Sequence, residues 1–355
     1  MIGICFGGYC PLHRGHLDVI YKSKKETDLT YVVVCGYESE PRGLDLGKNI
    51  REREILVRKF FKDDGLIKVI SANDTELGLD ESMRPENWKI WTSYVEKKIG
   101  DEEFIYYVGE PRYVKDLEGI GKNVKLVGIK DGKRENNISA SMIRQNPQKY
   151  WNKIASTFRP DLSKRILILG TASEGKTTLV TDISKYYQTP MITEFGRDYM
   201  EENCLLDTDL GVKEFTEFLL GQHRYIQKAI ENPNNPGFII SDTDNLVTLM
   251  YAKAYTEIPG MKITKREYEE ILYPLAKSLG EVTRWDKIFL IKPHGKFVND
   301  GLRYMEQSSI EERIGNYKIL IELLEDFGLL RITTELEGTY LEQYQAVKNY
   351  ICSFG

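Results

Sequence analysis

Eight residues near the middle of the chain have the types and spacing to bind a triphosphate: Gly170-Thr171-Ala172-Ser173-Glu174-Gly175-Lys176-Thr177. They fit the P-loop pattern G-x-x-x-x-G-K-[ST]. In such a loop backbone N–H groups surround phosphate oxygens, and the start of the next helix adds partial positive charge. Lys176 is expected to reach the β- and γ-phosphates, and Thr177 to bind Mg²⁺. The predicted ATP-binding residues here are Gly170, Ser173, Glu174, Gly175, Lys176, Thr177 and Thr178.

A glycine turn could match these letters by chance, so the flanking segments matter. An apolar run of strand type, 165–169, precedes the loop, and a helix-like segment, 178–183, follows it. A strand, then the loop, then a helix is the context in which the pattern binds phosphate. We therefore predict a functional P-loop.

A second phosphate site is indicated near the N-terminus by Gly7-Gly8-Tyr9-Cys10-Pro11-Leu12-His13-Arg14-Gly15-His16. Gly15 permits close approach of the backbone, and imidazole N–H groups can donate to phosphate oxygens. Two histidines three residues apart could also bind a metal, but no cysteine or carboxylate cluster accompanies them. Packing alone is a further alternative, but two of the chain's four histidines fall in this turn. We favour a phosphate site.

Acidic and basic residues downstream of the P-loop are candidates for binding a phosphate acceptor. Asp242 follows the apolar run 237–241 and is expected to bind Mg²⁺ with Thr177 or to polarise an acceptor hydroxyl. The predicted acceptor-binding residues are Glu194, Arg197, Asp242 and Asp244, and Arg303 is predicted to close over the transferred phosphate from a lid. A plain turn carboxylate is the alternative for Asp242, and a surface ion pair for Glu194 and Arg197. Arg313 is a weaker candidate for this lid, and a solvated helix residue is an equal alternative for it.

The elements that must position these residues read as two α/β domains, each with a parallel sheet. The runs 2–6 and 31–35 read as strands around a helix, which makes a βαβ unit with its ligand crevice at the strand ends. Further strands are predicted at 107–108, 287–292 and 329–334, and a closing helix at 340–351. We place the domains at 1–158, Rossmann-like, and 159–355, a P-loop domain. The boundary falls near Arg159, because 151–164 reads as a short connector or a final helix.

Composition limits the function classes. The chain has 355 residues, 41% hydrophobic and 29% charged, with a net charge of −5. This argues against a general nucleic-acid or membrane binder, and we see neither a membrane-length apolar run nor a signal peptide. The five cysteines lack C-x-x-C spacing, so we expect reduced thiols in a cytoplasmic protein, without zinc or disulfides. Homo-oligomerisation stays open.

The N-terminal motif resembles the signature of the nucleotidylyltransferase superfamily, G-x-F-x-P-x-H-x-G-H, with Tyr9 at a position where that family often has phenylalanine or threonine. The second family signature, I-S-x-[ST]-x-x-R, is matched by Ile138-Ser139-Ala140-Ser141-Met142-Ile143-Arg144. The resemblance implies transfer of a nucleotide monophosphate from ATP to a phosphate, with release of pyrophosphate. His13 and His16 would donate to the α-phosphate region, and Ser139, Ser141 and Arg144 would hold the β- and γ-phosphates with Mg²⁺. The implied ATP-binding residues are Gly7, Gly8, Tyr9, His13, His16, Ser139, Ser141 and Arg144.

Two tryptophans, Trp88 and Trp91, lie three residues apart between these signatures. In the nicotinate and nicotinamide mononucleotide adenylyltransferases, a tryptophan here stacks on the pyridine ring, and Trp91 is the closer match. Spacing alone allows both to be core residues. Arg51 and Arg53 resemble an arginine that follows the second strand in that family, and either could contact the nucleotide. Their alternative is a solvated helix face.

The two halves together resemble the NadR family, which couples ribosylnicotinamide kinase to nicotinamide mononucleotide (NMN) adenylyltransferase. The resemblance implies that the C-terminal half phosphorylates nicotinamide riboside to NMN. The N-terminal half then joins NMN to AMP from a second ATP, giving NAD and pyrophosphate, with Mg²⁺ in both steps. Longer family members carry an N-terminal helix-turn-helix. Here the first strand begins at residue 2, so we expect no DNA binding.

Three other hypotheses stay open. The chain could be another fused pair, such as one for coenzyme A assembly, although an aromatic platform suits a pyridinium ring better. One half could be inactive and serve only to sense pyridine nucleotide. The protein could also be an ATP-driven switch without a small-molecule acceptor. The complete histidine and serine–arginine motifs argue against the last two.

Overall fold

The computed structural model describes residues 1–38, 46–79, 85–130, 133–134, 138–293 and 309–354. The chain forms two compact units, Met1–Leu162 and Ser163–Gly355. The division falls four residues after the end of the first predicted domain, 1–158. The short helix α7 (Arg159–Leu162) therefore belongs to the first unit.

The first unit is built on a five-stranded parallel sheet in the order β3-β2-β1-β4-β5. Its strands are β1 (Ile2–Gly7), β2 (Leu29–Gly36), β3 (Ile67–Asn73), β4 (Phe104–Val108) and β5 (Val124–Leu126). Strand β3 was not predicted from the sequence, because the polar residues Lys68, Ser71 and Asn73 interrupt its apolar pattern. The chain leaves β1 toward β2 and returns to β4 on the other side of β1. A ligand crevice is expected where this order reverses, at the carboxyl ends of β1 and β4.

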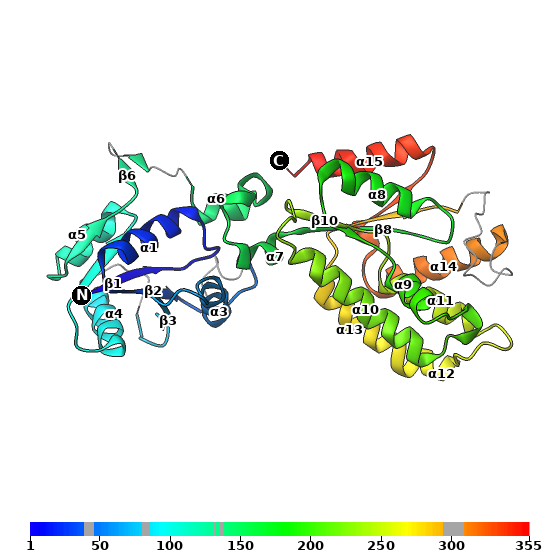
Figure 1. The fold of residues 1–355 in the computed structure, drawn as a ribbon, viewed down its shortest axis with the longest axis horizontal. Coiled ribbons are helices and arrows are strands. Elements are labelled where there is room, and N and C mark those ends of the chain that lie inside the picture. Colours follow the sequence, from blue (N-terminus) through cyan, green and yellow to red (C-terminus); the bar gives the residue numbers. More distant parts are fainter. Residues whose placement is uncertain (39–45, 80–84, 131–132, 135–137, 294–308, 355) are drawn as a thin grey trace. The chain divides into compact units, whose positions relative to one another are not determined.

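Helices cover both faces of this sheet (Figure 1). Alternate residues of β2 point to opposite faces, so Val32 and Val34 enter one core and Val33 enters the other. The first core is closed by α1 (Arg14–Glu26) and α3 (Ile50–Phe60), and the second by α4 (Pro85–Ile99) and α5 (Pro111–Glu118). The remaining elements are the hairpin of β6 (Ile129–Lys130) and β7 (Lys133–Arg134), helix α6 (Ala140–Gln145), and 3₁₀ turns at Gln148–Lys153 and Ser156–Phe158.

The second unit has its own five-stranded parallel sheet, in the order β12-β11-β8-β10-β9. The strands are β8 (Lys164–Gly170), β9 (Met191–Ile192), β10 (Phe238–Ser241), β11 (Lys287–Ile291) and β12 (Thr333–Leu336). The last strand begins four residues later than predicted, because a 3₁₀ turn occupies Leu330–Ile332. Strand β10 lies directly beside β8, so the residue that follows β10 lies next to the loop that follows β8.

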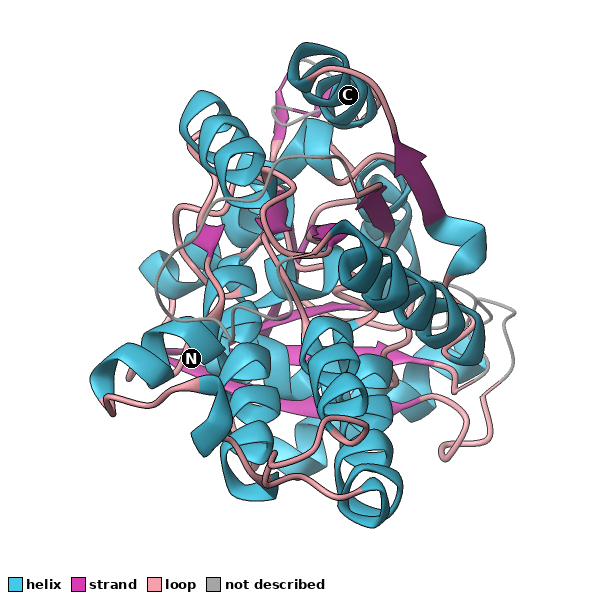
Figure 2. Ribbon diagram, turned by 90° about the vertical axis from the view of Figure 1, so that its right-hand side faces the viewer, coloured by secondary structure: helices cyan, strands magenta, loops and turns pink. Residues whose placement is uncertain are grey.

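Two helix layers enclose this second sheet (Figures 1 and 2). Helices α8 (Lys176–Tyr187) and α15 (Tyr340–Cys352) pack on one face. The other face carries α9 (Phe195–Glu202), α10 (Val212–Ile230), α11 (Asn245–Tyr255), α13 (Tyr273–Thr283) and α14 (Ile310–Asp326), with a short turn α12 (Lys265–Glu267). Helix α10 is long because buried residues recur at 215, 218, 219, 222, 226, 229 and 230, the period of one helix face.

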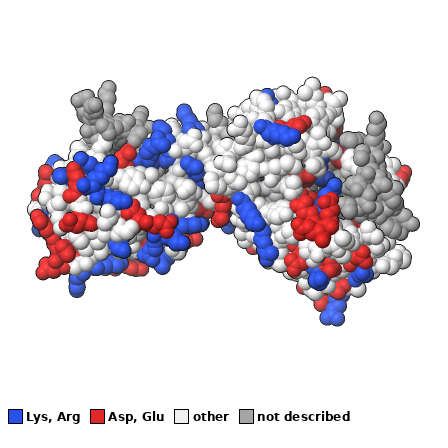
Figure 3. Space-filling model, viewed as in Figure 1, with Lys and Arg blue, Asp and Glu red and all other residues white. Residues whose placement is uncertain are grey.

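The surface carries charges of both signs. On the side shown in Figure 3, Lys and Arg are interspersed with Asp and Glu. Within the described parts of the chain, no helix combines the length and apolar character needed to cross a membrane.

Candidate active sites

The first unit has a cavity at the carboxyl ends of β1 and β4, where the strand order predicts a ligand crevice. Three parts of the chain contribute to its lining: segments within 5–19, segments within 107–113, and residues 127–128 with 138–141. Its polar lining residues include Tyr9, His13, His16, Asp18, Glu110, Arg112, Ser139 and Ser141. The cavity therefore combines Gly7, Gly8, both histidines and both serines of the two predicted motifs.

The two histidines lie face to face at the start of α1. His13 is the N-cap of the helix, and its Nδ1 accepts a hydrogen bond from the Gly15 backbone N–H at 3.2 Å. The rings of His13 and His16 are stacked with centroids 3.8 Å apart, and the Tyr9 ring meets His16 edge-on at 5.0 Å. Because Nδ1 of His13 is an acceptor, its Nε2 is the nitrogen that can donate to a phosphate. The N-terminus of α1 adds the partial positive charge of the helix dipole to the same place.

The second motif is held against the first by Arg144. Its Nη1 donates to the carbonyl of Cys10 at 2.7 Å, across 134 residues of sequence. Ser139 caps α6, since its side chain accepts from the Met142 N–H at 3.3 Å. Both motifs therefore meet at the turn that follows β1, which brings the segment of Arg144 to the segment of His16.

The tryptophans belong to an aromatic cluster next to this cavity. Trp88 and Trp91 are 8% and 4% exposed, and their rings lie 5.5 and 5.0 Å from the ring of Phe6. Phe6 and Tyr113 line the cavity, and Tyr113 meets Trp88 edge-on at 5.7 Å. The tryptophans thus support the cavity wall from behind in this conformation, and neither is among its lining residues.

The two candidate arginines differ in position. Arg53 is 1% exposed and donates through Nη1 to the carbonyl of Gly8, so it braces the turn after β1. Arg51 has a side chain that is 64% exposed, and it pairs with Glu54 at 2.7 Å. The structure brings Arg53 to the N-terminal motif and places Arg51 on the outer side of α3. The sequence could not decide between Arg51 and Arg53, because the two differ only in burial, which the sequence pattern does not show.

The P-loop of the second unit has its expected shape. Gly175 adopts a φ of 82° immediately before α8, a value that favours glycine. Gly170 has a φ of 154°, and a Cβ there would lie 3.0 Å from the carbonyl oxygen of Ile291. Lys176 donates from Nζ to the carbonyl of Thr171 at 2.6 Å, which curls its ammonium back over the loop. The ammonium is therefore held where phosphate oxygens would enter.

Asp242 lies beside the P-loop, as its place after β10 predicts. The Thr177 hydroxyl donates to Oδ2 of Asp242 at 2.5 Å. Asp242 is 4% exposed, and its other oxygen, Oδ1, is buried without a hydrogen-bond partner within the described residues. Burial raises the pKa of Asp242, while the Lys176 charge and the Thr177 hydrogen bond oppose that shift. A threonine hydroxyl next to a carboxylate whose second oxygen has no hydrogen bond provides the oxygen ligands that Mg²⁺ prefers.

Glu174 and Arg313 form a buried ion pair that the sequence did not reveal. Nη1 of Arg313 lies 2.8 Å from Oε1 of Glu174, and the side chains are only 2% and 0% exposed. Glu174 also accepts a hydrogen bond from the Thr171 hydroxyl at 3.2 Å. The predicted P-loop residue Glu174 thus ties the loop to the first turn of α14. Arg313, the weaker candidate, is a buried residue and not a solvated one.

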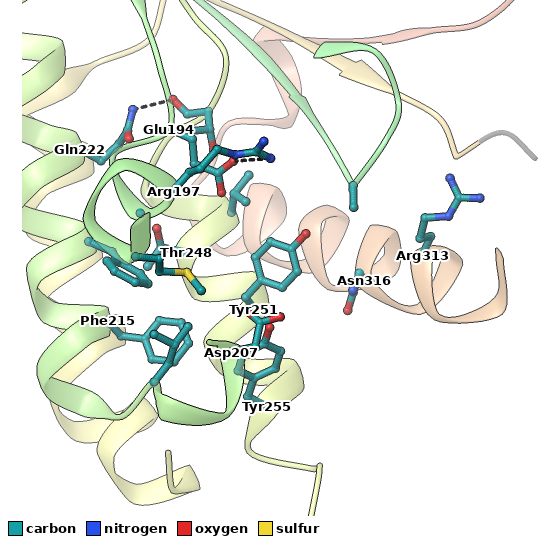
Figure 4. A pocket seen from close by; sticks show the side chains of 17 residues that line it. Glu194, Arg197, Asp207, Phe215, Gln222, Thr248, Tyr251, Tyr255, Arg313 and Asn316 are labelled. Carbon is teal, nitrogen blue, oxygen red and sulfur yellow. Dashed lines mark hydrogen bonds and ion pairs between the residues drawn. The ribbon is translucent and has the colours of Figure 1, made fainter. Parts of the chain in front are cut away.

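A second cavity lies beside the P-loop (Figure 4). Its lining includes Ala172 of the P-loop, the charged residues Glu194, Arg197, Asp207 and Arg313, and the aromatic residues Phe215, Phe218, Tyr251 and Tyr255. Gln222 fixes the corner before α9: its Oε1 accepts from the Phe195 N–H at 2.8 Å, and its Nε2 donates to the Thr193 carbonyl at 3.1 Å. Glu194 and Arg197 come into the cavity from this corner, 4.0 Å apart.

Two residues predicted to contact the acceptor or the transferred phosphate, Asp244 and Arg303, are not among the described residues that line the cavity. Asp244 is the N-cap of α11, accepting from the Leu246 N–H at 2.9 Å and from Nε1 of Trp285 at 2.8 Å. It is therefore committed to holding β10 and α11 in place, and the cavity lining does not include it. Arg303 lies outside the described residues. Sequence reasoning missed the aromatic wall and Asp207, because helical spacing of aromatic residues is equally typical of a core.

Comparisons with known proteins cover both units. A family model described as cytidylyltransferase-like matches residues 4–146, and one described as an AAA domain matches residues 165–342. Two curated relatives are each described as a trifunctional NAD biosynthesis/regulator protein NadR. The protein of Salmonella typhimurium is 26% identical over 98% of this chain and 82% of its own length. That of Escherichia coli is 27% identical over 95% and 79%.

Solved structures give the same result. A crystal structure of NadR protein in complex with NR is 30% identical and superposes with a TM-score of 0.84. Another, in complex with NAD and AMP-PNP, is 30% identical with a TM-score of 0.83. In both cases the match covers 99% of this chain and 95% of the other.

Proposed function

This chain belongs to the NadR family, and from that premise we propose that it makes NAD in two ATP-dependent steps. The second unit phosphorylates nicotinamide riboside to NMN, and the first unit adenylylates NMN to NAD. One observation carries this proposal: each unit has a separate phosphate-binding turn at the carboxyl end of its sheet, each facing its own cavity. The relatives' descriptions, NAD biosynthesis and complexes with NR, NAD and AMP-PNP, agree with both steps.

In the first step the 5′-hydroxyl of the riboside attacks the γ-phosphorus of ATP, and ADP leaves. The P-loop N–H groups and Lys176 hold the triphosphate, and the riboside occupies the cavity that opens beside Ala172. Asp242 accepts a hydrogen bond from Thr177 of the loop, so it would polarise the acceptor hydroxyl either directly or through the Mg²⁺ that it would hold. Glu194 and Arg197 face the acceptor from the start of α9.

The residues beside the P-loop also fit a bound Mg²⁺. Thr177 and Asp242 would hold it, because the hydroxyl is bonded to Oδ2 of this carboxylate and the buried Oδ1 has no hydrogen-bond partner within the described residues. The described residues contain no group of three or more His, Cys, Asp or Glu that could hold a metal by themselves. A site completed by phosphate oxygens and water is typical of Mg²⁺, which would offset the triphosphate charge.

In the second step a phosphate oxygen of NMN attacks the α-phosphorus of ATP, and pyrophosphate leaves. No covalent enzyme intermediate is needed, so the protein acts by alignment and by charge stabilisation. His16 and the Nε2 of His13 would donate to the α-phosphate, and the N-terminus of α1 would add its partial charge. Ser139, Ser141 and Arg144 would hold the leaving pyrophosphate. The cavity wall of Phe6 and Tyr113, supported by the tryptophans, would receive the pyridine ring.

The proposal is tested by following NMN and NAD separately after mixing the protein with Mg·ATP and nicotinamide riboside. Lys176→Ala should abolish formation of NMN and leave conversion of added NMN to NAD intact. His16→Ala should do the reverse. Loss of both activities from either single change, in a protein that is still folded, would contradict two independent sites. Failure of the unmodified protein to phosphorylate the riboside would contradict the kinase assignment.

A further inference from the structure

The cavity of the second unit has two chemically different ends (Figure 4). Arg197 and Glu194 lie at the end toward the corner before α9, and Arg313 lies beside the P-loop. The opposite end is walled by Phe215, Phe218, Tyr251 and Tyr255. Their rings form a continuous row, with centroids 5.8 Å apart for Phe215–Phe218, 6.0 Å for Phe215–Tyr255 and 6.1 Å for Tyr251–Tyr255.

This polarity fixes the direction in which a riboside can bind. Its 5′-hydroxyl must reach the γ-phosphate at the P-loop, near Lys176 and Asp242. The ring on the other side of the ribose must then extend away from the loop, toward the aromatic end. A pyridinium ring is cationic, and aromatic faces stabilise a cation. The pyridine ring is therefore expected against the row of Phe and Tyr rings.

Asp207 is a charged residue at the aromatic end of the cavity. It lies in the 3₁₀ turn Asp207–Asp209, it is 7% exposed, and it lines the cavity together with Tyr251 and Tyr255. A carboxylate with so little exposure interacts strongly with charged groups in the cavity, because little water screens its charge. Its negative charge complements the pyridinium ring and falls within the region that the substituent of the ring must occupy.

We propose that Asp207 is a specificity-determining residue, which makes the kinase step accept the carboxamide form of the riboside and reject the carboxylate form. This rests on the proposed kinase function. A carboxamide can donate an N–H to the Asp207 carboxylate, which is a charge-assisted hydrogen bond. A nicotinate carboxylate has no proton to donate and brings a second negative charge to a nearly buried site. Repulsion of two carboxylates at contact distance in such a site discriminates on the order of 100-fold.

The experiment compares kcat/KM for phosphorylation of nicotinamide riboside and nicotinate riboside by the full-length protein with Mg·ATP. The unmodified protein should prefer the amide on the order of 100-fold. Asp207→Asn should narrow the ratio to within about tenfold, mainly by improving use of nicotinate riboside. Asp207→Glu keeps the charge and should keep the preference. Asp209→Asn is the matched control, because Asp209 is 41% exposed and pairs with Lys262.

The results separate the two claims. An unchanged ratio in Asp207→Asn, or equal use of both ribosides by the unmodified protein, would overturn the role of Asp207 while leaving the kinase assignment in place. A change of similar size in Asp209→Asn would also overturn it, because the effect would then be general to the turn. If the unmodified protein phosphorylates neither riboside, the kinase assignment fails and this inference fails with it.

Discussion

Removing Glu174 should weaken ATP binding at the P-loop through Arg313. Glu174→Ala leaves the Arg313 guanidinium, 2% exposed, without the carboxylate that lies 2.8 Å away. Stranding one partner of a buried ion pair costs about 3–5 kcal/mol. The change also removes the acceptor of the Thr171 hydroxyl, and Thr171 carries the carbonyl to which Lys176 donates. We therefore expect KM for ATP in the kinase step to rise at least tenfold, about 1.4 kcal/mol.

The companion measurement is a double-mutant cycle with Arg313→Met. Removing both charges should cost less than the sum of the single changes by at least about 1 kcal/mol, because the double variant strands no charge. Unfolding of the second unit is followed by hydrogen exchange of α8 and α14. Adenylyl transfer to added NMN is the internal control, since it is assigned to the other unit. Additive free energies, or an unchanged KM for ATP, would refute the idea that this pair organises the loop.

Three further predictions concern single residues. Burial raises the pKa of Asp244 from 3.8 to about 6. Its contribution to the free energy of unfolding is therefore fully present below pH 4. About 3 kcal/mol of that stability is lost as the pH rises through 6. Asp244→Asn should flatten that pH dependence in hydrogen exchange of α11, and equal slopes in both proteins would contradict it. Gly170→Ala should lower Tm of the second unit and cost about 1–3 kcal/mol, since the Cβ meets the Ile291 carbonyl at positive φ. Arg144→Lys should slow adenylyl transfer at least tenfold with phosphorylation unchanged, because one ammonium cannot bond the Cys10 carbonyl and also present a planar fork to the phosphates. Equal loss in both steps would refute this.

Motifs whose chemistry depends on local backbone geometry could be predicted from the sequence. The turn before His13 and the P-loop before Lys176 each follow an apolar strand and precede a helix, and the structure has both in that form. The position of Asp242 followed from the same logic, since neighbouring parallel strands end at one edge. Arg144 is expected beside the histidine motif from the family resemblance, and its guanidinium bonds the Cys10 carbonyl of that motif.

Contacts between distant segments could not be predicted. The sequence around Glu174 does not indicate that its partner, Arg313, lies 139 residues away. Asp207 follows no strand and belongs to no motif, and only the packing of α10 and α11 brings aromatic residues to its side. Asp244 has the same residue type and nearly the same position as Asp242, yet one caps a helix and the other faces the P-loop. Such differences arise from side-chain direction at a strand end, which spacing does not encode.

The hydrogen bond from Trp285 to Asp244 provides an optical readout of the kinase unit. Trp285 is the one tryptophan that the sequence places after residue 162, and its indole N–H donates to a carboxylate two residues from Asp242. Replacing Trp88, Trp91 and Trp151 with phenylalanine would leave emission from this indole alone. Nucleotide and metal that bind at Thr177 and Asp242 would then change the electric field around this indole. Tryptophan fluorescence would therefore report occupancy of the kinase site without a signal from the adenylyltransferase site.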